Sequence, residues 1–302
     1  MALYWRKAPR RAALKISCCN CPSAPIHSLE RTSIAQSSIW ISTFGASSLR
    51  LMELATISYE DLRDVILRWI SSLVSHFVES ATSKAGAEIL VTVLVTPADQ
   101  CSRPIVSMEK IDTWLHVTWS VWDPCSLATV EVFGPPRLNP LAKASSWLRE
   151  RTPLEDRKSL KATEVVLLSE SEGSLLEGLV TNFFVALKDG AVQTANENVL
   201  FGAMRDIVLR VCLEDGIPVH LSAPKKQDMD QWAGAFITNV NRPVMAVSEI
   251  RIPTAKDQSE QGFPLRSIII KFEPNALINR LRESVLEEIS KLATPLLRQI
   301  DG

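Results

Sequence analysis

The sequence predicts an α+β protein of two domains, a sheet-and-helix layer followed by a strand-rich domain. Its 302 residues suffice for about two domains at the usual ~100–200 residues each. In residues 59–79 apolar side chains recur every three or four positions, as in an amphipathic helix with one buried stripe. Later, short β-branched runs alternate with turn residues and helical patterns, which is typical of a strand-rich domain.

Three β-rich segments follow the first helix. The second alternates apolar and polar residues, so its apolar side chains are expected to face the core. Gly134-Pro135-Pro136 then interrupts the pattern, and we take residues 135–142 as a linker between an N-terminal domain, 50–134, and a C-terminal domain, 143–302. The predicted strands are 87–95, 115–121 (with Leu115, Val117, Trp119 and Val121 inward) and 129–133.

The C-terminal domain begins with a charged helical stretch that starts at Lys143 and runs through Arg151. Asp189-Gly190 is a strong hairpin signal between two β-rich runs. Periodicity predicts further helices at 202–213 and 277–292. The predicted strands of this domain are 164–168, 182–187, 191–194, 235–238, 244–250 and 267–272.

Residues 1–49 differ in composition from the rest of the chain. They are rich in serine and carry six Lys or Arg residues against one acid, Glu30. This composition is typical of a transit peptide and would direct the protein to a chloroplast or mitochondrion. The alternative is an N-terminal extension on a cytoplasmic protein.

Several classes of function are disfavoured by composition and spacing. The net charge of -1 provides no general attraction for nucleic acid, and no apolar run of about 18 residues is present to cross a membrane. The four histidines and six cysteines show no metal-ligand or Ser-His spacing, and no Gly-rich phosphate loop occurs. The remaining options are a lysine mechanism or no catalysis.

Two residues are candidates for such chemistry. Lys143 lies among small and apolar neighbours, and a lysine that loses hydration has a lowered pKa and becomes a usable amine. Glu177 follows two leucines, and a carboxylate in apolar surroundings needs a cationic partner. Taken singly, the sequence context of each favours an ordinary surface lysine and an ordinary turn acid.

Together these segments resemble the class IV aminotransferases, pyridoxal-phosphate enzymes of fold type IV, and among them plant D-amino-acid-aminotransferase-like proteins. The resemblance implies a two-domain fold with a C-terminal strand-rich pseudo-barrel, and a homodimer. It extends over about residues 140–247, and Glu-Gly-x-x-Thr-Asn-x-Phe at 177–184 is its most specific motif. The matching segments are 142–149, 164–169, 176–185, 190–194, 200–212 and 235–238.

The resemblance also implies a role for each matching residue. Lys143 would bind the cofactor covalently and move a proton at the substrate Cα, and Glu177 would pair with the pyridine nitrogen. Backbone amides after Gly202 would hold the phosphate, as helix N-termini do. The implied cofactor-binding residues are Glu177, Thr181, Asn182, Gly202, Ala203, Met204, Thr238, Asn239 and Asn241.

The reaction implied is transfer of an amino group from a D-amino or branched-chain amino acid to a 2-oxo acid. Met204 and Asn241 stand where many members carry hydroxyl residues, and the His-x-x-Arg-Leu segment that supplies a phosphate arginine is not found. Two alternatives stay open: an aminodeoxychorismate lyase, which the motifs do not separate from a transaminase, or a catalytically weak paralogue lacking that arginine.

Overall fold

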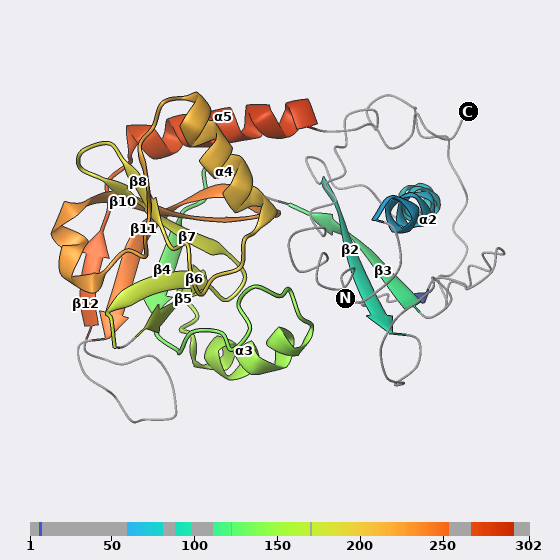
Figure 1. The fold of residues 1–302 in the computed structure, drawn as a ribbon, viewed down its shortest axis with the longest axis horizontal. Helices are drawn as coiled ribbons and strands as arrows, with labels where there is room; N and C mark the ends of the chain where they lie inside the picture. The colour runs from blue at the N-terminus through green and yellow to red at the C-terminus, as the bar shows by residue number, and fades with distance from the viewer. Residues whose placement is uncertain are drawn as a thin grey trace. The chain divides into compact units, whose positions relative to one another are not determined.

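The computed structural model describes residues 6–7, 59–80, 88–97, 111–121, 123–169, 171–253 and 267–292, and Figure 1 shows the fold. The chain divides into two compact units. The first comprises Met1–Thr43, Leu51–Val121 and Ala293–Gly302, and the second Phe44–Arg50 and Trp122–Leu292. Residues 135–142, which the sequence suggested as a linker, therefore lie inside the second unit. Of the predicted leader, all but residues 6–7 fall outside the described residues.

The first unit contains one helix and a three-stranded antiparallel sheet among its described residues. Ile66, Ile70 and Val74 recur every four positions of the helix and are buried, so the predicted apolar stripe is confirmed. Phe77 of the helix contacts Trp119 of the sheet, with ring centroids 5.2 Å apart. The elements are α2 (Tyr59–Ser80) and, in sheet order, β1 (Arg6–Lys7), β3 (Ile111–Ser120) and β2 (Glu88–Pro97).

One inward residue of this sheet was predicted wrongly. Leu115 and Val117 are buried as expected, and Trp119 is partly buried. Val121, however, is 67% exposed, because β3 ends at Ser120 and none of the described strands pairs with it beyond that residue.

The second unit is built on a nine-stranded mixed sheet. Strands β10, β11, β4, β5, β6 and β7 pair in that order, and β7 also pairs with β10, so these six form a closed ring. Closure leaves no free edge within the ring. The strands are β4 (Ala128–Val132), β5 (Glu164–Ser169), β6 (Ser174–Gly178), β7 (Asn182–Leu187), β8 (Val192–Thr194), β9 (Val219–Leu221), β10 (Trp232–Asn239), β11 (Arg242–Pro253) and β12 (Ser267–Lys271).

Strand β4 corrects the sequence-based division of the chain. Its residues were assigned to the N-terminal domain, but β4 pairs in parallel with both β5 and β11 and is part of the ring. Its apolar side chains are fully buried in the core of the second unit. Strands β6 and β9 and the short helix η3 (Lys226–Gln231) were not predicted, since each is short and carries little periodicity.

Both faces of the ring are covered by apolar side chains. In β5, Val166 and Leu168 belong to a large apolar core shared with β4, β6, β7, β10 and β11. Val165 and Leu167 point to the other face and pack with Trp147 and other residues beneath helix α3 (Ser146–Arg157). This alternation follows from the two-residue period of a strand. Helices α4 (Ala203–Glu214) and α5 (Ala276–Leu292) contact each other and lie together on the other side of the sheet from α3 in Figure 1.

The helix predicted to start at Lys143 begins three residues later, at Ser146. Lys143 consequently lies in the loop before α3, and its backbone conformation is not fixed by helical hydrogen bonds. The other two predicted helices of this unit are confirmed, with α4 starting directly after Gly202.

The stacked pair Phe184–Phe236 provides a test of the core. The two rings are fully buried, 4.7 Å apart and nearly parallel, at 7°. Phe236→Ala opens a cavity between β7 and β10 and is expected to lower the free energy of unfolding by about 3–5 kcal/mol. Urea unfolding followed by tryptophan fluorescence measures it. Leu213→Ala, at a position 80% exposed, is the control and should stay within about 0.5 kcal/mol; equal effects of both changes would contradict the packing.

Candidate functional site

A buried ion pair lies at the end of strand β6. Arg137 donates from Nη1 to Oε1 of Glu177 over 3.3 Å, and their side chains are only 5% and 4% exposed. The other carboxylate oxygen of Glu177 accepts the backbone N–H of Leu200 at 2.9 Å. Burial raises the pKa of Glu177 to about 7, against the lowering effects of the Leu200 N–H and of Arg137. Glu177 can therefore exist in either charge state near neutral pH.

The same arginine reaches the loop that carries Lys143. Its Nη2 donates to the carbonyl oxygen of Ala142 over 2.8 Å, and its guanidinium carbon lies 4.7 Å from the centre of the Trp147 ring. Lys143 keeps an exposed surface, yet surrounding protein removes part of its hydration, and this effect, with the charge of Arg137, lowers its pKa. Lys143 and Glu177 are thus joined through Arg137.

A second buried acid, Glu164, holds the turn that follows Glu177. Its carboxylate accepts the backbone N–H groups of Leu179 and Val180, at 3.2 and 3.3 Å, and the hydroxyl of Thr181 at 3.0 Å. Burial raises the pKa of Glu164 although these donors favour the ionised form. Gly178 is required here, since a Cβ would lie 2.1 Å from the Thr181 hydroxyl oxygen. Thr181 is therefore committed to the turn.

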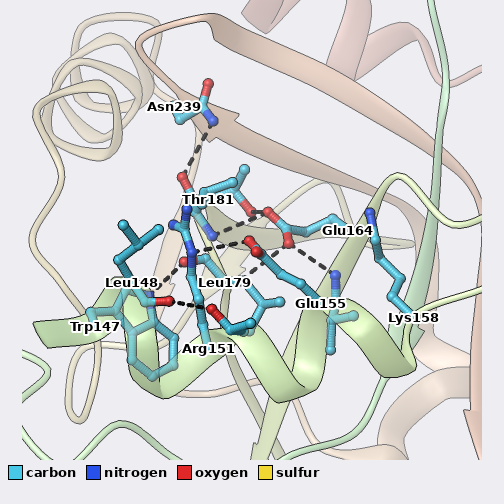
Figure 2. Close-up of polar contacts among 12 residues, drawn as sticks. Trp147, Leu148, Arg151, Glu155, Lys158, Glu164, Leu179, Thr181 and Asn239 are labelled. Atoms are coloured by element: carbon cyan, nitrogen blue, oxygen red, sulfur yellow. Dashed lines mark hydrogen bonds and ion pairs between the residues drawn. The ribbon is translucent and has the colours of Figure 1, made fainter. Parts of the chain in front are cut away.

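Figure 2 shows that the carbonyl groups of this turn are held from two other elements. Trp147 at the start of α3 donates its indole N–H to the carbonyl oxygen of Leu179 over 2.7 Å. Asn239 at the end of β10 donates to the carbonyl oxygen of Val180 over 3.3 Å. The turn is thereby fixed on both its donor and its acceptor groups.

Asn182 connects this turn to the start of α4. Its side-chain amide donates to the carbonyl oxygen of Leu200 over 2.7 Å, and its Oδ1 would lie 2.5 Å from a Cβ placed on Gly202. Only glycine leaves this approach unhindered. Gly202 is the N-cap of α4 and forms no side-chain cap, so the first amides of the helix, those of Ala203 and Met204, have no acceptor within the helix.

Thr238 lies beside Asn182 in the sheet and has a buried hydroxyl group. The two residues are register partners between β10 and β7, and Thr238 is only 1% exposed. Its Oγ1 is buried without a hydrogen-bond partner among the described residues. An unpaired buried hydroxyl is costly, and one near a helix N-terminus suits a ligand with phosphate oxygens.

The remaining predicted residues have different surroundings. Asn239 uses both ends of its amide within the protein, because its Oδ1 also accepts the backbone N–H of Arg242 at 2.8 Å. Asn241 is exposed in the tight turn between β10 and β11. Met204 is buried in the first turn of α4. The structure therefore gathers most of the predicted residues at one end of the ring, and their roles toward a cofactor stay predictions.

Sequence reasoning missed two arginines. Arg137 lies in the proline-rich segment interpreted as a linker, where nothing in the local sequence indicates burial. Arg205 of α4 is 3% exposed and donates to the carbonyl oxygen of Ala195 and the side chain of Asn196, both at 3.0 Å. Arg205 holds the loop that ends at Leu200 and so supports the amide that contacts Glu177.

The raised pKa of Glu177 predicts a pH-dependent stability. Because the folded-state pKa of about 7 exceeds the usual 4.5, ionisation disfavours the folded state, and stability present below pH 4.5 is lost as pH rises toward 7. The unfolding free energy of Glu177→Gln minus that of wild type should therefore increase by about 3 kcal/mol between pH 4 and pH 8. Urea unfolding at each pH measures the difference. The exposed control Glu150→Gln should follow wild type, and a flat difference for Glu177→Gln would refute the burial argument.

Comparison with solved structures supports the fold. A branched-chain aminotransferase from Thermoproteus uzoniensis, solved with norvaline, is 14% identical, with a TM-score of 0.54 over 83% of this chain and 79% of that chain. An aminotransferase from Brucella abortus, bound to the cofactor PLP, is 18% identical, with a TM-score of 0.52 over 72% and 74%. At these identities the likeness concerns the fold alone, which is that of fold-type IV aminotransferases.

Other relatives are matched over less of their length. The branched-chain amino acid aminotransferase from Thermobaculum terrenum, solved in its PLP form, is 14% identical with a TM-score of 0.50, and the match covers 67% of this chain. The chain spans 64% of that relative, less than two thirds. The comparison with curated proteins gave no match. Among the described residues, no helix is long and apolar enough to cross a membrane, and no group of three His, Cys, Asp or Glu could hold a metal ion.

The sequence profile of one family matches most of the chain. The family is described as amino-transferase class IV, and the match extends over residues 51–250 of the 302. It contains the segment from Arg137 to Thr238 in which Lys143 and Glu177 are joined through one arginine. The chain therefore belongs to the class IV aminotransferase family.

Proposed function

We propose that the protein is a pyridoxal-phosphate-dependent aminotransferase that moves an amino group between an amino acid and a 2-oxo acid. One observation carries this proposal: Arg137 bonds both to Glu177 and to the carbonyl of the residue before Lys143. The loop that carries a lysine of lowered pKa and a buried acid are thereby held by one arginine. These are the two side chains that the chemistry requires.

The residues present fit the cofactor. Glu177 would hold the protonated pyridine nitrogen, since its pKa of about 7 allows it to ionise when a cation approaches. The amides of Ala203 and Met204 would hold the phosphate at the N-terminus of α4, and the unpaired hydroxyl of Thr238 would donate a further hydrogen bond. Charge-assisted hydrogen bonds of this kind are roughly twice as strong as neutral ones.

Lys143 would do the proton chemistry. Its lowered pKa increases the fraction of unprotonated amine, which is the form that attacks an aldehyde carbon and accepts the proton from the substrate Cα. When bound, pyridoxal phosphate supplies an electron sink that stabilises the negative charge left at Cα. Glu177, whose ionised form Arg137 favours, would maintain the positive charge on the ring.

For the substrate we propose a D-amino or branched-chain amino acid, with a 2-oxo acid as acceptor. Two of the structural relatives described above are branched-chain aminotransferases. We further propose that the chain acts as a homodimer. A weak paralogue is the second candidate, because Met204 offers no hydroxyl in the first turn of α4.

Trapping the cofactor tests the proposal. Incubation with pyridoxal phosphate should give a visible absorption band, and borohydride should then fix the cofactor on Lys143, detected by peptide mass spectrometry. Lys143→Arg should lose both signals, whereas the exposed control Lys161→Arg should keep them. A folded wild-type protein without band or adduct would overturn the proposal.

Substrate screening separates the reactions. Cofactor-loaded protein is supplied with L-valine or D-alanine plus 2-oxoglutarate, and glutamate formation is measured. Pyruvate release from aminodeoxychorismate, without glutamate formation, would instead establish the lyase. Bound cofactor without turnover of any of these would favour the weak paralogue.

Thr238 provides an independent test of the phosphate site. In protein without cofactor, Thr238→Val should leave stability unchanged or raise it by about 1 kcal/mol, because the buried hydroxyl has no partner among the described residues. The matched control Thr194→Val removes a hydroxyl that donates to the carbonyl of Phe183 over 2.8 Å and should cost about 1 kcal/mol or more. Equilibrium titration should show that only Thr238→Val weakens pyridoxal phosphate binding, by about tenfold; equal affinity of the two variants would contradict the assignment.

A further inference from the structure

Arg137 connects more parts of the site than any other cation described there. It makes three contacts with three parts of the second unit: the carboxylate of Glu177 at 3.3 Å, the carbonyl oxygen of Ala142 at 2.8 Å and the ring of Trp147 at 4.7 Å. Its side chain is 5% exposed. The guanidinium therefore cannot turn to solvent without breaking all three.

The stability of the fold does not account for this arginine. Its Nε is buried without a partner among the described residues, so the group is desolvated but not fully compensated. A buried ion pair commonly contributes less to stability than a well-packed apolar pair of similar volume. A role in the chemistry of the site explains the pair better than stabilisation does.

The charges around Arg137 indicate what that role is. Glu177 approaches from β6 with Glu164 from β5 as a further negative charge, and Lys143 approaches from the loop before α3. The positive charge of Arg137 lowers the pKa of both reacting groups. It thereby favours the ionised form of Glu177 and the neutral form of Lys143. Both effects produce the charge states that an amine nucleophile and a partner for a protonated ring nitrogen require.

We propose that Arg137 is a positioning residue that couples Lys143 to Glu177, bonding to the carboxylate of the acid and holding the lysine loop through the carbonyl of Ala142. The inference rests on the proposed function for its purpose. The effect of Arg137 on the pKa of Lys143, however, is already present in the protein without cofactor. It can therefore be tested separately from transamination.

Competitive labelling with acetic anhydride measures the link. The full-length protein without cofactor is labelled over a range of pH, and the acetylation of Lys143 is quantified by peptide mass spectrometry against an internal amine standard. In Arg137→Met, which keeps a long apolar side chain, the pKa of Lys143 should rise. Labelling at a fixed pH below that pKa should fall about threefold to tenfold. Arg137→Lys, which keeps the positive charge, should recover at least half of the wild-type labelling.

Arg205→Met is the matched control. Arg205 is also buried, also lies beside an aromatic ring and also has an Nε unpaired among the described residues, but it does not contact Ala142 or Glu177. It should lower stability and leave the labelling of Lys143 unchanged. Wild-type labelling in folded Arg137→Met, or an equal fall in both variants, would overturn the proposal.

A second variant covers the case in which Arg137→Met does not fold. Arg137→Met with Glu177→Gln removes both partners, which avoids an isolated buried charge. Its Lys143 labelling should fall as in the single variant, and wild-type labelling would overturn the proposal. A fall in labelling together with no borohydride adduct in wild type would mean that the link exists and the proposed function fails, so the two are distinguishable.

Discussion

The buried contact between Arg137 and Glu177 is the constraint on which the arrangement of the site depends. Two charges out of water need close geometry and further hydrogen bonds to offset their desolvation. The additional hydrogen bonds go to backbone groups: Glu177 accepts one from the N–H of Leu200, and Arg137 donates one to the carbonyl oxygen of Ala142. As a result, one ion pair fixes the position of the lysine loop and of the loop that leads into α4. Loops are usually the least constrained parts of a protein, and here the charge pair restrains two of them.

The closed ring of strands explains why this pair lies close to the N-terminus of α4. In the sheet, Asn182 of β7 is the register partner of Glu177 in β6 and of Thr238 in β10. Three polar side chains from three strands therefore meet at one end of the ring. Asn182 extends the set by bonding to the carbonyl of Leu200 and approaching Gly202. The register of the strands thus accounts for the position of the site, and the turn held by Glu164 keeps that register.

Regular elements were largely predictable from the sequence, because periodicity and turn residues are local signals. Strand β7 and helix α5 match their predicted ranges within one residue. The prediction was wrong where a contact between residues far apart in the sequence determines whether a segment is buried. Residues 135–142 resemble a linker, since prolines and a lone arginine give no sign of burial, yet Arg137 is drawn inside by an acid forty positions later. Glu164 was correctly predicted to begin a strand, but its hold on the following turn depends on the pairing of β5 with β6.

The pKa of Glu177 shows why the neighbour of this acid is a cation and not a neutral donor. Even with Arg137 and the Leu200 N–H lowering it, burial leaves the pKa at about 7. Without a positive neighbour the acid would be largely protonated at neutral pH and would present a donor, not an anion, to a ring nitrogen. A fully exposed acid would be anionic, but water would weaken its attraction for a cation. A buried acid balanced by one arginine is anionic enough to pair with a cation and sufficiently shielded from water for that pairing to be strong.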